Sequence, residues 1–289
     1  MDSSLKSRFS NLAGQETSVI ARRDGRHGYY LRPNAVEAVT VPVSGTAVPP
    51  NEAAAVAGRD AQKEEKFRAI YMAWCEQENE FPVLVDHTQA LRQQRGINKW
   101  KFPDVVAVRW EVLEFNERQE PRLNKDALAV RQSLGEQSFR LSSTELKVKI
   151  DSGNLRESFF QCVSNSRWAH SARLAIACNI SDEAIANEVR RLGSSYGVSV
   201  IAFSLQSEDF DKLPDAAQIK TIDQVESLLD RSLVKSTLVL ANDKEDLDWE
   251  HIKDMKQQHK VYDELFPWIS KCMSDCKPHS FVVWKGLLR

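Results

Sequence analysis

Two carboxylates and a lysine in this chain have the types and the spacing needed for metal-dependent chemistry on a phosphodiester. Asp104 opens an apolar run at 105–108, and Glu145 and Lys147 lie in an alternating run that extends to residue 150. Both runs are predicted to be strands. Residues two apart on a strand share a face, so Lys147 is expected on the side of Glu145.

These residue types suit a hard divalent cation. Mg²⁺ keeps several waters and takes one or two carboxylates, which Asp104 and Glu145 supply if their strands are neighbours. The backbone carbonyl of Leu146 is a further candidate ligand. Lys147 would then hold the attacking water or offset negative charge in the transition state. The expected cofactor is Mg²⁺ or Mn²⁺.

A helix is predicted over residues 60–78 and carries a third carboxylate. Apolar side chains recur there at helical spacing, at Phe67, Ile70, Tyr71 and Trp74. Glu64 lies at the edge of this stripe and is expected to face the site, whereas Glu65 points away. The competing interpretation is a first-turn Glu64 that satisfies the helix N-terminus.

Another helix is predicted over 154–174. Its apolar side should pack on the sheet, and its other side gathers Glu157, Gln161, Ser164, Asn165 and Trp168. Amides, hydroxyls and an aromatic ring suit contact with a phosphate backbone or a base, so Asn165 and Trp168 are candidate nucleic-acid contacts. The alternative is an ordinary solvated face with one exposed tryptophan.

The chain is expected to have four parts. Residues 1–33 contain a hairpin at 20–31 with an Asp24-Gly25 turn, whose basic residues Arg22, Arg23 and Arg26 would touch DNA phosphates as a wing does. A solvated hairpin is the equally weighted alternative. Residues 34–58 are predicted to be a linker, 59–205 a catalytic core, and 206–289 a mainly helical extension.

The order of elements in the core indicates an α/β domain with a mixed central sheet flanked by helices. Strands are predicted at 83–85, 105–108, 145–150, 174–178 and 198–203, with residues 114–140 as an excursion and a helix at 182–192. Helices at 222–233 and 249–273 follow in the extension. Leu265, Phe266 and Trp268 are expected to cap the core.

Composition narrows the class of protein. Nothing resembles a membrane span or a signal peptide, and the five cysteines form no even disulfide framework, so a cytoplasmic protein is expected. The net charge of −2 excludes a uniformly basic DNA-binding protein. DNA would therefore have to be held by local basic patches, by metal, or with the help of a second copy or a partner protein.

Several of these motifs together resemble a known superfamily. The Phe102-Pro103-Asp104 motif, then Glu145-Leu146-Lys147, then a helix bearing Gln161 is similar to the PD-(D/E)xK, or restriction-endonuclease-like, nucleases. Within it, the chain resembles bacterial proteins of obscure function that join a winged helix to such a nuclease domain. This narrower likeness covers roughly 20–205 and rests on Gly28-Tyr29-Tyr30-Leu31, Glu64, Trp100, Pro103-Asp104, the 154–169 stretch and the 193–201 stretch.

The resemblance implies a catalytic set of Glu64, Asp104, Glu145 and Lys147, with Gln161 in support. The expected activity is Mg²⁺-dependent DNA cleavage, in defence against foreign DNA. The winged helix is represented only by its last part, which again points to a partner chain or a dimer. A catalytically silent DNA-binding or assembly subunit is the alternative, and RNA cleavage stays open.

Overall fold

The structure is a computed structural model that describes residues 20–22, 29–31, 50–86, 90 and 100–287. The chain divides into two compact units, Met1–Ala54 and Ala55–Arg289. In the first unit, β1 (Ile20–Arg22) and β2 (Tyr29–Leu31) pair antiparallel, which confirms the strands of the predicted hairpin. Its turn, with Arg23 and Arg26, lies outside the described residues, and its role as a wing stays a prediction.

The predicted linker is wrong over its last part. Residues 50–58 belong to a long helix, α2 (Pro50–Gln77), while 34–49 lie outside the described residues. The alanine-rich segment that was assigned to the linker has high helix propensity, because alanine loses no side-chain entropy in a helix. Because α2 starts at Pro50, Glu64 lies in the middle of the helix. The alternative interpretation, in which Glu64 satisfies the helix N-terminus from the first turn, is therefore wrong.

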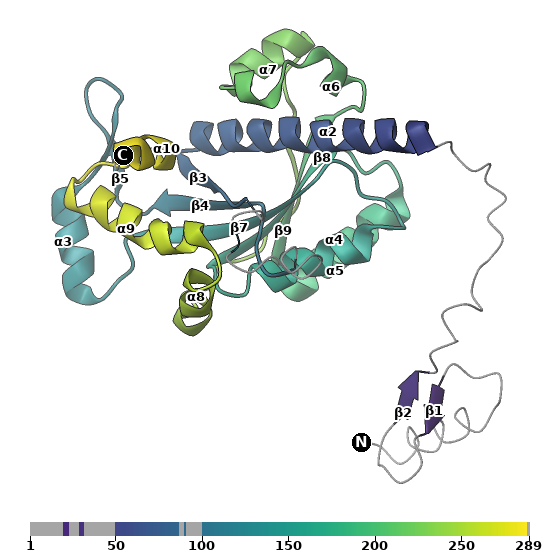
Figure 1. Ribbon diagram of the computed structural model, residues 1–289. Helices are drawn as coiled ribbons and strands as arrows, with labels where there is room; N and C mark the ends of the chain where they lie inside the picture. Colours follow the sequence, from purple (N-terminus) through teal and green to yellow (C-terminus); the bar gives the residue numbers. More distant parts are fainter. Residues whose placement is uncertain (1–19, 23–28, 32–49, 87–89, 91–99, 288–289) are drawn as a thin grey trace. The chain divides into compact units, whose positions relative to one another are not determined.

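The second unit is built on a mixed six-stranded sheet in the order β10-β9-β8-β7-β4-β3 (Figure 1). The three strands β7, β8 and β9 run parallel, while β4 pairs antiparallel with β7, β3 with β4, and β10 with β9. The α/β class is therefore confirmed. The strands are β3 (Glu80–Leu84), β4 (Val105–Trp110), β7 (Phe139–Lys147), β8 (Ser171–Cys178), β9 (Val198–Leu205) and β10 (Ser236–Val239).

One face of the sheet is covered by α2. Phe67, Ile70, Tyr71 and Trp74, which set the predicted helical phase, are all buried there against alternate residues of the strands. The short helix α6 (Asp209–Lys212) and α7 (Ile222–Leu229) complete this layer. The alternation is visible in β8, where Ala175 and Ala177 belong to this core.

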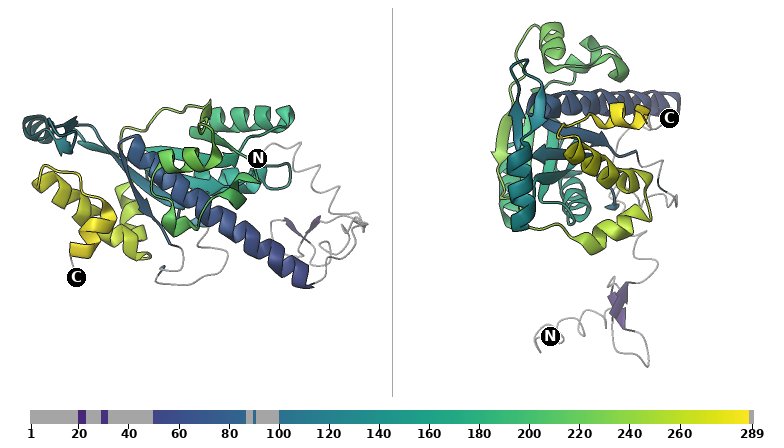
Figure 2. Two further views of the ribbon diagram at one scale, coloured as in Figure 1. Left: turned by 90° about the horizontal axis from the view of Figure 1, so that it is seen from above. Right: turned by 90° about the vertical axis from the view of Figure 1, so that its left-hand side faces the viewer.

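The opposite face is covered by α4 (Leu155–Asn165) and α5 (Glu183–Tyr196) (Figures 1 and 2). Leu174 and Ile176 of β8 point to this side, as the period of a strand requires. Gly193 of α5 permits close packing of β10, because a Cβ there would lie 2.8 Å from Val239 Cγ2 and 2.9 Å from the Val198 carbonyl oxygen. Any larger residue would push α5 away from β10.

A third core lies at the β3–β4–β7 side of the sheet, under the C-terminal helices. It gathers Trp110, Trp168, Tyr262 and Trp268 among others, so the prediction that the C-terminal segment caps the core is confirmed for Leu265 and Trp268, with Phe266 partly buried against it. The C-terminal helices are α8 (Trp249–Lys256), α9 (Lys260–Ser274) and α10 (Phe281–Leu287), and α3 (Lys125–Leu134) joins them on this core.

Several predicted boundaries were wrong. The strand expected at 145–150 is β7, which begins at Phe139 and ends at Lys147. The helix expected to reach 174 ends at Asn165, because the chain turns into β8 at Ser171. The excursion contains a small hairpin, β5 (Leu113–Phe115) and β6 (Pro121–Leu123), besides α3. The extension contributes a strand, β10, that was not predicted.

Among the residues that the structure describes, no helix is both long and apolar enough to cross a membrane.

Candidate active site

The pairing of β4 with β7 places the two predicted metal-binding carboxylates beside each other. Val105 pairs with Thr144, and the Asp104 amide donates to the Thr144 carbonyl at 3.1 Å. Asp104 precedes Val105 and Glu145 follows Thr144, so antiparallel pairing sets Asp104 opposite Glu145. The Leu146 amide donates to Asp104 Oδ2 at 2.8 Å, which fixes this carboxylate against the backbone between Glu145 and Lys147.

Glu145 is held from two sides in a buried position. Its side chain is only 6% exposed, and Lys147 Nζ lies 2.9 Å from its Oε1. On the other oxygen, Asn165 Nδ2 of α4 donates to Oε2 at 3.1 Å. The same amide group donates to the Phe102 carbonyl at 3.0 Å. Asn165 thus joins Glu145 to the segment that leads into Asp104.

The electrostatics of this pair follow from burial. Burial raises the pKa of Glu145 to about 7, the negative charge of Asp104 adds to the rise, and Lys147 opposes it. For Lys147, burial acts to lower the pKa, but the carboxylates, Glu145 first, outweigh it, so the pKa of Lys147 is raised. Lys147 is therefore a permanent cation, while Glu145 changes charge near neutral pH.

The helix α2 brings two more charged residues to the same place. Glu64 and Arg68, one turn apart, line a cavity of about 60 Å³ with Asp104 and Lys147. Glu64 is exposed. Its pKa is nevertheless raised, by partial burial of the carboxylate and then by Asp104, against the attraction of Lys147. Arg68 Nη2 lies 3.8 Å from Asp104 Oδ1.

The structure therefore brings together Glu64, Asp104, Glu145 and Lys147 from three elements, and adds Arg68, which the sequence reasoning missed. These five residues are called the Asp104 cluster below. The sequence could have indicated Arg68, because residues four apart on a helix are neighbours and Glu64 is predicted to face the site.

The predicted polar face of α4 is exposed only in part, at Glu157 and Ser164. Gln161 and Asn165 are buried, and Trp168 beyond the helix end is fully buried, with its indole N–H donating to the Asn165 carbonyl at 2.8 Å. Trp168 packs against Tyr262 of α9 in the third core. Neither Asn165 nor Trp168 is available as a nucleic-acid contact. Gln161 lies one turn before Asn165 and does not line the cavity of the Asp104 cluster.

The remaining predicted contacts fall in the first unit. Arg22 is the last residue of β1. Arg23 and Arg26 lie outside the described residues, so the three arginines stay predicted phosphate contacts.

The donor set fits a magnesium-type ion. Its carboxylates are Glu64 and Asp104, which line the cavity, and Glu145, which is buried beside Asp104 and does not line it. In the described part of the chain, no group of three or more His, Cys, Asp or Glu residues is arranged to hold a metal. An ion at this place would have Asp104 and Glu145 as its protein ligands and would keep several waters, which Mg²⁺ accepts.

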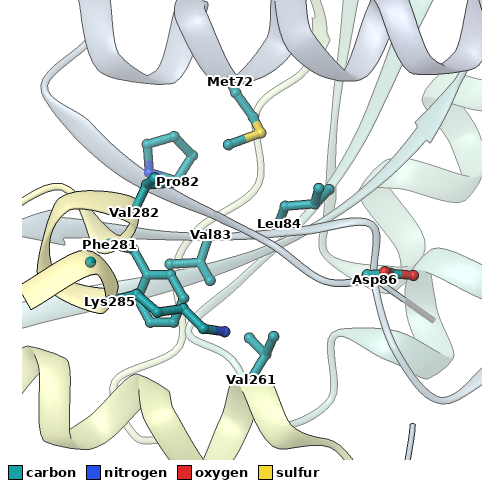
Figure 3. Close-up of a pocket in the computed structure, with 10 residues that line it drawn as sticks. Met72, Pro82, Val83, Leu84, Asp86, Val261, Phe281, Val282 and Lys285 are labelled. Atoms are coloured by element: carbon teal, nitrogen blue, oxygen red, sulfur yellow. The ribbon is translucent and has the colours of Figure 1, made fainter. Parts of the chain in front are cut away.

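A separate hollow of about 480 Å³ lies between α2, β3, α9 and α10, and shares no lining residue with the Asp104 cluster. Figure 3 shows Met72, Leu84 and Phe281 around it, with Lys285 and Asp86 as its charged members. Its lining is largely apolar.

Comparisons of the chain with protein-family models, with curated proteins and with solved structures find no match.

Proposed function

We propose that the chain is a metal-dependent nuclease that hydrolyses DNA phosphodiester bonds at the Asp104 cluster. The observation that carries the proposal is the position of Asp104 opposite Glu145, one residue beyond the Val105–Thr144 pair of β4 and β7, with Lys147 on the same side as Glu145. Carboxylates alone occur in many structural ion pairs. Two carboxylates opposite each other, one of them lining a cavity, support the binding of a hydrated Mg²⁺, which takes one or two carboxylates.

Each residue has a distinct role in this proposal. Asp104 and Glu145 would hold the cation, which supplies polarisation of the phosphate and a more acidic water. Lys147 keeps its proton, so it would orient the attacking water and stabilise charge on the phosphate, and it would not act as a base. Glu64 would accept a hydrogen bond from the water shell of the ion, because it lines the cavity from α2.

A second candidate is a catalytically silent DNA-binding or assembly subunit with the same fold. The observation in its favour is that the chain supplies its own cations to both carboxylates, Lys147 to Glu145 at 2.9 Å and Arg68 to Asp104 at 3.8 Å. The cavity beside them is small, at about 60 Å³. In such a site the carboxylates are neutralised by the chain's own cations and need no metal ion.

A cleavage assay distinguishes the two. Purified chain is incubated with supercoiled plasmid in Mg²⁺, in Mn²⁺ and in EDTA, beside Asp104→Asn, Lys147→Ala and the matched control Lys149→Ala. Lys149 is exposed and lies two residues further along. Nicking is expected only in the reactions that contain Mg²⁺ or Mn²⁺. The cleavage rate should fall by about a hundredfold or more in Asp104→Asn and Lys147→Ala, as when one transition-state contact is removed, and it should be unchanged in Lys149→Ala.

The outcomes separate cleanly. Cleavage that survives Asp104→Asn, or that proceeds in EDTA, contradicts the proposed site. Absence of cleavage of duplex DNA, single-stranded DNA and RNA, together with DNA binding, supports the silent subunit. Selective cleavage of RNA would keep the site and change the substrate.

A further inference from the structure

Arg68 occupies a position on α2 that the chemistry of carboxylates and metal does not require. It lines the same cavity as Asp104 and Lys147, and its side chain is 30% exposed, so it is accessible from solvent. Its Nε is buried and has no hydrogen-bond acceptor among the described residues. A guanidinium group that keeps an unused donor beside a cavity has capacity for another ligand.

The ion pair of Arg68 with Asp104 is weak. Its Nη2 lies 3.8 Å from Asp104 Oδ1, beyond the range of an N–H···O hydrogen bond. The other oxygen, Oδ2, is held by the Leu146 amide at 2.8 Å. Removing Arg68 from Oδ1 would therefore leave Asp104 in place. A partly exposed ion pair at this distance contributes little stability, so exchanging it costs little.

Resting on the proposed nuclease function, we propose that Arg68 binds a phosphate group of the DNA strand at the Asp104 cluster, and that it does so once a divalent cation has taken over the neutralisation of Asp104. In the metal-free protein Arg68 is the counter-ion of Asp104. When the cation binds, the guanidinium is released toward the cavity, where its planar fork matches two phosphate oxygens.

This exchange couples the two ligands. The cation frees Arg68 for the phosphate, and the phosphate removes Arg68 from competition with the cation. Each ligand must therefore increase the affinity of the other by the same factor. Lys147 is not the cation exchanged at Asp104, because its ammonium lies 2.9 Å from Glu145 Oε1, whereas Arg68 Nη2 faces Asp104 Oδ1.

The test measures DNA binding in the presence of Ca²⁺, so its readout does not depend on DNA cleavage. The affinity of a fluorescent 20-base-pair duplex is measured with and without Ca²⁺ for the whole chain, Arg68→Gln, Arg68→Lys and the control Arg59→Ala. Arg59 is exposed on the same helix. Calorimetry gives the Ca²⁺ affinity of each protein without DNA, and thermal unfolding confirms that each variant is folded.

In the unaltered chain and in Arg59→Ala, Ca²⁺ should tighten DNA binding. In Arg68→Gln this tightening should fall about tenfold or more, as for the loss of one charge-assisted hydrogen bond. In Ca²⁺, the slope of the logarithm of the DNA-binding constant against the logarithm of the salt concentration should be smaller in magnitude by about 0.9 for Arg68→Gln, which corresponds to one phosphate contact. Arg68→Lys should keep the salt slope but recover only part of the affinity, because it has the charge without the fork. Ca²⁺ without DNA should bind Arg68→Gln at least as tightly as the unaltered chain.

Failure takes two distinguishable forms. If the chain binds Ca²⁺ but Arg68→Gln shows the same coupling to DNA, the role of Arg68 is refuted and the proposed function stands. If the unaltered chain binds no Ca²⁺ or Mg²⁺ at all, the proposed function fails, and the exchange fails with it.

Discussion

Replacement of Glu145 by glutamine should stabilise the metal-free protein, and increasingly so as pH rises. The pKa of Glu145 is about 7 in the folded chain against an ordinary value of 4.5. The folded state therefore binds this proton more tightly than the unfolded state. Its contribution to the free energy of unfolding is complete below about pH 4.5 and is lost as pH rises to about 7.

The magnitude follows from the size of the rise. At 1.36 kcal/mol for each pKa unit, ionising Glu145 costs the folded protein roughly 3 kcal/mol. This pKa already includes the attraction of Lys147. The variant is therefore expected to be the more stable protein at high pH even though it removes the ion pair with Lys147. Glutamine has nearly the shape of the protonated acid and does not ionise. The variant should thus equal the unaltered chain near pH 4.5 and exceed it by roughly 3 kcal/mol at pH 8, about 6–12 °C in Tm for a domain of this size.

The assay is urea and thermal unfolding in EDTA from pH 5 to 8.5. Glu65→Gln is the matched control, since Glu65 is exposed on α2, and its difference from the unaltered chain should not depend on pH. Saturating Mg²⁺ should narrow the gap at pH 8, because only the unaltered chain gains stability from the bound ion. A difference that stays flat with pH, or a variant less stable at pH 8, refutes this account of the Asp104 cluster.

Four other outcomes are expected. Asn165→Ala should raise the pKa of Glu145 further, because a hydrogen-bond donor to its carboxylate is lost. The Mg²⁺ affinity measured by calorimetry at pH 7 should therefore fall, and an unchanged affinity would contradict the role of Asn165 in positioning Glu145. Glu64→Gln should reduce plasmid cleavage while leaving the folded fraction unchanged by circular dichroism; full activity would show that Glu64 is only a helix-surface residue. Glu80→Gln should destabilise the fold by about 3–5 kcal/mol in urea unfolding, because it leaves Arg173, 2.6 Å from Glu80 Oε1, as an uncompensated buried charge; a loss below about 1 kcal/mol would refute this. Light scattering and DNA titration should show self-association or weak, salt-sensitive binding by the isolated chain, and a stable monomer with nanomolar affinity at physiological salt would exclude dependence on a second copy or partner.

Local patterns determined much of this protein. The repeat of Phe67, Ile70, Tyr71 and Trp74 gave the phase of α2, and with it the position of Glu64 on the inner side. The alternation around Glu145 gave the common face of Glu145 and Lys147, since the period of two is a property of the extended backbone itself. The α/β class followed from the order of such runs. All of these depend on residues close together in the chain.

Only the tertiary structure decided what those elements contact. Trp168 is polar-tipped and follows a polar helix face, so it was expected at the surface, yet Tyr262, nearly a hundred residues later, encloses it. Asn165 became the link between Glu145 and Phe102 because the end of α4 lies beside β7 and beside the segment that leads into β4. The strand β10 carries only four residues, too few to show a pattern, and exists because β9 offers it a partner. Burial and pairing of this kind arise from contacts between distant segments, which local periodicity does not encode.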